Sequence, residues 1–134
     1  MLTIDIDVIR VTLHVLAATV WVGGQIVLVA LMPTLHRVAP AATVPVARTF
    51  AWVSWPAFVL LILTGLWSYP FGIEMDKAFQ STMGVKLTLV ILSGVGVLAH
   101  TVAKRAVFKS IWGAVGLLCA LGAVLFGVLI GASV

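Results

Sequence analysis

Charged side chains are scarce in this chain of 134 residues: Asp, Glu, Lys and Arg make up only 9% of it, whereas 63% of the residues are hydrophobic. A water-soluble domain of this size would lack the polar groups needed to cover its surface. The composition therefore excludes an ordinary soluble fold and predicts an integral membrane protein.

Cysteine and acidic residues are the scarcest of the chemically useful side chains. Cys119 is the only cysteine, so neither a disulfide within the chain nor a cysteine-based metal motif can form. The four acids, Asp5, Asp7, Glu74 and Asp76, lie in the N-terminal segment or in one connection. This placement argues against a Ser/His/Asp hydrolase, and no glycine-rich phosphate loop is present in the sequence.

Four apolar segments fill most of the chain, and each reaches the roughly 20 residues that a helix needs to cross a bilayer. Their approximate bounds are residues 8–32, 46–69, 80–103 and 110–132. The connections are too short to hold another domain, and short connections place successive helices antiparallel. We therefore predict an all-α fold: residues 1–134 form one four-helix transmembrane domain, an up-down bundle.

The few basic residues favour one orientation in the membrane. The first and third connections, with their margins, carry five basic residues and no acid: Arg37, Arg48, Lys104, Arg105 and Lys109. Basic residues in short loops stay on the cytoplasmic side, so we expect both termini outside and the basic loops in the cytoplasm. We expect a multi-pass protein of a bacterial plasma membrane. The formal net charge of +4 is divided between two membrane faces, so we expect no binding to nucleic acid.

Two of the predicted helices carry a polar stripe. When residues are placed 100° apart around each helix, the polar side chains of each fall on one face. On the first helix this face holds Arg10, His14, Ala18, Trp21, Gln25 and Met32. On the third helix it holds Lys86, Val90, Ser93, Val97, His100 and Lys104. An imidazole or a charge that faces lipid costs several kcal/mol. We therefore expect both stripes to face the bundle interior.

Depth along the helices separates these polar groups. His100 lies 14 residues beyond Lys86, roughly 21 Å along a helix, so His14 and His100 cannot share one metal ion. We expect His36 to be a solvated loop residue. An outer cluster of Arg10, His14 and Lys86 is left, with Met83 one turn nearer the surface than Lys86.

The positive charge of this outer cluster favours an anionic ligand over a bare cuprous ion. A b-type haem would suit it, with His14 as an axial ligand and Lys86 or Arg10 paired with the propionates. Trp21 and Gln25 share the face of His14 and are further candidates for cofactor binding. The alternative is that Arg10 and Lys86 extend to the membrane interface and that His14 bonds a main-chain carbonyl.

Small side chains recur every fourth residue in the last segment, at Cys119, Ala123, Gly127 and Gly131. Such a stripe lets another helix approach closely, or makes room for a flat cofactor. The partner helix can belong to this chain, to a second copy in a homodimer, or to a larger membrane complex.

Three stretches resemble a known family. Residues 13–24, which read LHVLAATVWVGG, resemble the first helix of the CopD-like membrane proteins. Arg-Thr-Phe-Ala at 48–51 leading to Leu-Thr-Gly-Leu-Trp at 63–67 resembles that family's second helix, and Gly-Val-Lys-Leu-Thr-Leu-Val at 84–90 resembles the start of its next one. The layout is also similar to that of the HemJ-type protoporphyrinogen oxidases. The resemblance covers about residues 11–105.

The two resemblances imply different cofactors. The CopD resemblance implies copper uptake or resistance. The HemJ resemblance implies b haem and electron transfer linked to porphyrinogen oxidation, with His14 as haem ligand and Lys86 as the accompanying basic residue.

Three functions follow as expectations. The first is a redox protein that binds haem b and passes electrons to partners in the membrane, as part of oxidoreductase chemistry. The second is a copper protein in which His14, Met83 and Met75 form an outer entry site, with His100 a further candidate ligand. The third is an accessory subunit whose small-residue stripe docks to a larger complex.

Overall fold

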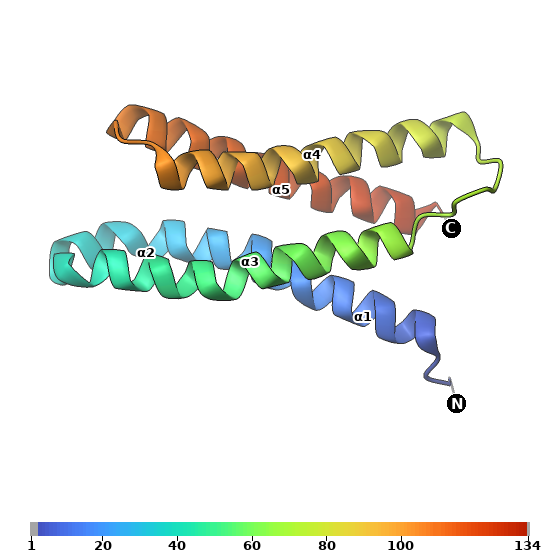
Figure 1. Cartoon of the computed structure of the whole chain (residues 1–134), viewed down its shortest axis with the longest axis horizontal. Coiled ribbons are helices and arrows are strands. Elements are labelled where there is room, and N and C mark those ends of the chain that lie inside the picture. The colour runs from blue at the N-terminus through green and yellow to red at the C-terminus, as the bar shows by residue number, and fades with distance from the viewer. Residues whose placement is uncertain (1–2, 134) are drawn as a thin grey trace. The chain divides into compact units, whose positions relative to one another are not determined.

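Helices account for nearly all of the described part of the chain. The computed structural model describes residues 3–133, and within that range it has no β-strand (Figure 1). The elements are α1 (Ile6–Ala18), the π-helical η1 (Thr19–Gly23), α2 (Gly24–Val38), the short 3-10 helix η2 (Pro40–Ala42), α3 (Thr43–Trp67), α4 (Lys77–Val102) and α5 (Ala106–Ala132). The predicted all-α class is confirmed.

The helices form two compact units that meet in sequence at Phe71 and Gly72. In the first, the N-terminal hairpin, α1, η1 and α2 follow one another as a long helix that lies against α3 (Figure 1). In the second, the C-terminal hairpin, α4 and α5 are packed against each other. Each hairpin places its two long helices antiparallel, as the short connections predict.

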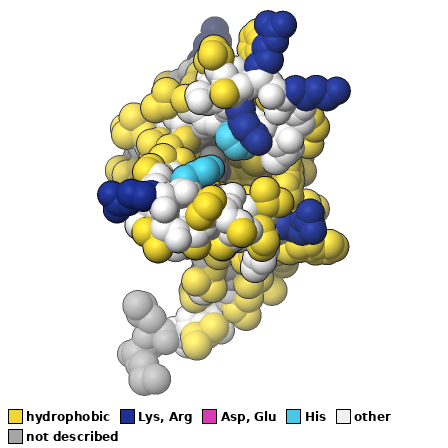
Figure 2. All heavy atoms as spheres, turned by 90° about the vertical axis from the view of Figure 1, so that its left-hand side faces the viewer, with side chains coloured by type: hydrophobic (Ala, Val, Ile, Leu, Met, Phe, Trp, Pro, Cys, Tyr) yellow, Lys and Arg dark blue, Asp and Glu magenta, His cyan; other side chains and the backbone are white. Residues whose placement is uncertain are grey.

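Length and composition make each long helix able to cross a membrane. Among the described residues four stretches qualify, with mean hydropathies from 1.7 to 2.5: Ile6–Val38, Pro40–Trp67, Lys77–Val102 and Ala106–Ala132. Many Val, Leu and Ile side chains along them are exposed on the outside of the molecule. In the view of Figure 2 basic side chains interrupt a mainly apolar surface, and no acidic side chain is visible. An apolar exterior of this extent suits lipid as the surrounding medium.

The first helix is longer than predicted. It begins at Ile6, where the Asp5 carboxylate caps it by accepting the Val8 N–H at 2.9 Å. It ends at Val38 instead of near Met32, because Pro33 lies inside α2 without ending it. Proline removes only one helical donor, and helices in membranes tolerate this loss. The remaining ends lie within a few residues of the predicted ones.

His36 is therefore in a helix and not in a loop. It lies in the last turn of α2, where its Nδ1–H donates to the Met32 carbonyl at 2.9 Å. Its side chain is exposed, which agrees with the prediction of a solvated residue. Pro40 opens η2 and Pro45 lies in the first turn of α3, positions at which no helical N–H is required.

The C-terminal hairpin is held by close contact between glycine backbones. A Cβ added to Gly96 of α4 would lie 2.6 Å from the Gly116 nitrogen of α5. One added to Gly127 would lie 3.4 Å from Nζ of Lys86, whereas one added to Gly131 would meet open space. The small-residue face of α5 therefore packs on α4 of the same chain, and its closest approach lies nearer the start of α5 than the predicted stripe.

Candidate functional site

A polar seam joins α1 to α3 in the N-terminal hairpin. Arg10 and His14 are one turn apart on α1, and Thr64 and Ser68 are one turn apart on α3. Because the helices are antiparallel, Arg10 pairs with Ser68 and His14 pairs with Thr64. The polar stripe predicted for the first helix thus meets a second polar stripe, in reverse order.

His14 makes the central contact of this seam. Its Nδ1 lies 2.8 Å from Thr64 Oγ1. Thr64 Oγ1 in turn lies 2.7 Å from the Leu60 carbonyl oxygen and 3.2 Å from that of Leu61, and both oxygens can only accept. The single hydroxyl proton therefore goes to the main chain, and His14 Nδ1–H donates to Thr64. In the neutral ring this tautomer carries its lone pair on Nε2.

Gly65 lies directly beside the imidazole. A Cβ at this position would approach His14 Cε1 to 3.4 Å and Nδ1 to 4.0 Å. Both distances are ordinary van der Waals contacts, so Gly65 packs against the edge of the imidazole. The Thr-Gly pair at 64–65 therefore contacts one imidazole twice, since Thr64 accepts its hydrogen bond and Gly65 lies against its edge.

Arg10 lies one turn before His14 and already has partners. Its guanidinium donates to Asp7 Oδ1, from Nε at 3.3 Å and from Nη2 at 3.2 Å, and Nη1 donates to Ser68 Oγ. Ser68 Oγ donates to the Thr64 carbonyl at 2.8 Å. Arg10 thus ties α1 to α3 at the end of the seam, and its predicted pairing with a propionate stays a prediction.

Trp21 and Gln25 lie about two and three turns beyond His14 along the same continuous helix. Trp21 lies in the π-helical turn η1, and its side chain is 2% exposed. The Gln25 amide nitrogen donates to the Trp21 carbonyl at 3.0 Å, so this buried amide satisfies a carbonyl within the irregular turn. Gln25 therefore has a structural role here, and its predicted role in cofactor binding stays a prediction.

The Trp21 indole is part of an aromatic cluster with α3. Its ring centroid lies 5.4 Å from that of Trp55 and 4.3 Å from that of Phe58, and Trp55 and Phe58 are 5.7 Å apart, nearly perpendicular. Such edge and tilted contacts add to the stability gained from burial alone. The cluster fixes the register of α1 against α3 on the far side of Thr64 from Arg10.

The remaining predicted residues are on α4 in the C-terminal hairpin. Met83 is buried, and Lys86, one turn later, lies across Gly127 of α5. The predicted pairing of Lys86 with a propionate stays a prediction. Met83 and His100 are 17 residues apart on one continuous helix, about 25 Å, so these two side chains cannot bind the same ion.

His100 has a structural contact. Its Nδ1–H donates to the Lys109 carbonyl at 2.7 Å, and a Cβ on Gly113 would lie 2.9 Å from the same nitrogen. The ring thus joins the end of α4 to the first turns of α5. Within residues 3–133 no group of three or more His, Cys, Asp or Glu side chains forms a ready metal site.

In comparisons with known proteins, no protein-family model, curated protein or solved structure matches this chain. The seam must therefore be interpreted from its own chemistry.

The periodicity of the polar stripes did not predict Thr64 and Ser68 as the partners of His14 and Arg10. The available signal was their spacing of four residues, which repeats that of Arg10 and His14 in the opposite direction.

Proposed function

We propose that this chain is a multi-pass membrane protein of the CopD and HemJ type that binds b haem through His14 and passes electrons within the membrane. One observation carries the proposal: a histidine in an apolar helix has its Nδ1–H held by a hydroxyl. Histidines that bind metals usually donate the other ring N–H to a hydrogen-bond acceptor, which fixes the tautomer and makes the ligating nitrogen more basic.

The residues of the N-terminal hairpin fit an axial haem ligand. Thr64 sets the tautomer in which Nε2 carries the lone pair, and Gly65 lies against the edge of the ring. The mainly apolar side chains of these helices would limit the access of water to the site, which is a condition that tunes haem potentials. The haem would supply a one-electron redox centre, whereas the chain would supply binding, orientation and a low dielectric.

An optical spectrum tests the proposal directly. Protein expressed with haem available and purified in a mild detergent is expected to show a Soret band, with about one b haem per chain by the pyridine haemochrome assay. His14→Ala is expected to abolish the band. His36→Ala and His100→Ala are the control variants, because His36 is exposed in the last turn of α2 and His100 lies at the end of α4, both outside the polar seam; each is expected to retain the band.

Other outcomes select the other functions. One copper per chain without a Soret band would favour the copper protein and overturn the haem proposal. Absence of both cofactors, with the chain co-purifying in a larger complex, would favour the accessory subunit. Retention of the Soret band in His14→Ala would show that haem binds elsewhere in the chain.

A further inference from the structure

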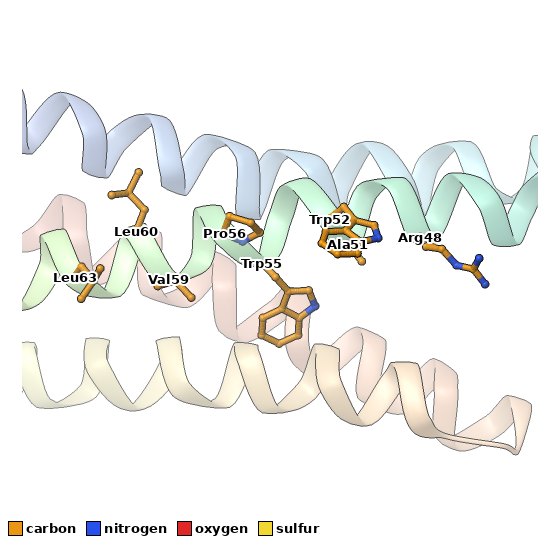
Figure 3. Close-up of a pocket in the computed structure, with 8 residues that line it drawn as sticks. All are labelled: Arg48, Ala51, Trp52, Trp55, Pro56, Val59, Leu60 and Leu63. Atoms are coloured by element: carbon orange, nitrogen blue, oxygen red, sulfur yellow. The ribbon is translucent and has the colours of Figure 1, made fainter.

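A hollow of about 700 Å³ follows one side of α3 (Figure 3). Its lining comes from this helix alone and is apolar except at one end, where Arg48 lies. The hollow forms because Ala51 and Pro56 are small, whereas Trp52 and Trp55 beside them are large. From Arg48 to Leu63 it extends along the helix by about 22 Å.

Within the N-terminal hairpin this surface is uncovered, and its cation has no acidic partner. The Trp52 side chain is 77% exposed, and Arg48 is exposed as well. Within residues 3–133 the only ion pair joins Arg10 to Asp7, so Arg48 has no acidic partner there. The acids of the sequence lie before α1 or in its first turn, and after α3, so none is on the part of α3 that bears Arg48.

The position of Arg48 along the helix matters. It is in the second turn of α3, about 7 Å from the helix start at Thr43, and the apolar lining extends from it toward the middle and far end of the helix. If α3 crosses a bilayer, this places a guanidinium at the level of the lipid head groups and the hollow at the level of the acyl chains. Arginine pairs with phosphate through two parallel hydrogen bonds.

We propose that the hollow on α3 is a binding site for an anionic phospholipid, whose phosphate pairs with Arg48 and whose acyl chain lies between Trp52, Trp55 and Leu63. The charge complementarity selects an acidic lipid over a zwitterionic one, and the apolar lining selects a lipid over free phosphate. This inference depends on the membrane insertion proposed above and is independent of haem binding.

Tryptophan quenching by brominated acyl chains tests the site. The full-length chain is reconstituted in vesicles of phosphatidylcholine that contain increasing fractions of brominated phosphatidylglycerol or brominated phosphatidylcholine. Half-maximal quenching is expected at about a fivefold lower fraction of the acidic lipid, since one basic group near the surface contributes a preference of this order. Trp52→Phe is expected to remove most of the lipid-selective part of the quenching.

Arg48→Gln is expected to abolish the preference, whereas Arg37→Gln, an exposed basic residue outside the hollow, is expected to retain it. Ala51→Leu fills the hollow and is expected to weaken quenching by both lipids. Equal quenching by the two lipids, equal losses in the two arginine variants, or reversal by inorganic phosphate would each overturn the proposal. So would absence of quenching in a chain that forms a dimer, because a second copy would then cover α3.

Resistance to carbonate extraction from the same vesicles shows separately whether the chain is inserted. Extraction of the chain would contradict the membrane insertion itself. An inserted chain without lipid preference would contradict the lipid site alone.

Discussion

At the scale of single residues, His14 depends on a hydroxyl that is on another helix. Thr64 has two roles, since it accepts from His14 Nδ1 and donates to the Leu60 carbonyl. Loss of the hydroxyl would leave an imidazole N–H without its acceptor in an apolar hairpin. Inter-helix hydrogen bonds in membranes contribute about 0.6 kcal/mol on average and up to about 1.7 kcal/mol.

Thr64→Val is therefore expected to destabilise the chain by about 1 kcal/mol and to lower the occupancy of the proposed haem. Nitrogen-15 spectra of the histidine rings are expected to show a single Nδ1-protonated tautomer for His14 in the wild type and a mixture in the variant. Thr88→Val is the matched control, because Thr88 donates to its own helix at Gly84 and to nothing on another helix. Thr64→Ser should restore the tautomer; equal effects of Thr64→Val and Thr88→Val would contradict this role.

The sequence singles out His14 as a candidate site residue but does not identify its hydrogen-bond partner. Hydrocarbon does not solvate an imidazole, so any deep histidine on an apolar helix must face other protein groups. Which group it faces depends on the register of α1 against α3, and this register is set by the contacts of Trp21 with Trp55 and Phe58. Composition and periodicity contain no information about such a register.

At the scale of elements, helix type and approximate bounds follow from the apolar runs, whereas irregular turns within them do not. The π-helical turn Thr19–Gly23 lies inside a run that is uniformly helical by pattern. Gln25 donates a hydrogen bond to the Trp21 carbonyl within this turn. The role of this contact cannot be recognised before the irregular turn is known. The predicted bound near Met32 was also too early, because α2 continues through Pro33 to Val38.

The α4–α5 contact gives a sharper prediction at this scale. A Cβ at Gly96 would meet the nitrogen and Cα of Gly116 at 2.6 and 2.7 Å, and backbone atoms cannot move aside without separating the helices. Gly96→Ala is expected to destabilise the C-terminal hairpin by about 1–3 kcal/mol in a reversible unfolding titration in mixed micelles. The helix propensity of alanine opposes this by less than about 1 kcal/mol.

Gly84→Ala on the same helix is the control, because a Cβ there meets nothing within 4 Å. Only the gain in helix propensity remains at Gly84, so that variant is expected to be as stable as the wild type or more so. Equal stability of Gly96→Ala and the wild type would show that α4 and α5 are not in backbone contact.

At the scale of the whole molecule, the distribution of charge predicts the orientation that the chain would have in a membrane. The N-terminal hairpin has acids at the start of α1 and basic residues at the α2–α3 connection, and the C-terminal hairpin has basic residues at the α4–α5 connection. Lys and Arg in short loops resist transfer across the membrane, whereas acids have little effect. Both termini and the α3–α4 connection are therefore expected outside.

Cysteine labelling in intact cells tests this orientation, because Cys119→Ser yields a chain without other cysteines. A membrane-impermeant thiol reagent is expected to label Ile73→Cys in the α3–α4 connection and to leave Ala41→Cys in η2 unlabelled until the cells are opened. Both positions are exposed, so the difference reports sidedness and not burial. Labelling of Ala41→Cys in intact cells would show that the chain has the opposite orientation. Arg48 and its proposed lipid would then lie in the outer leaflet.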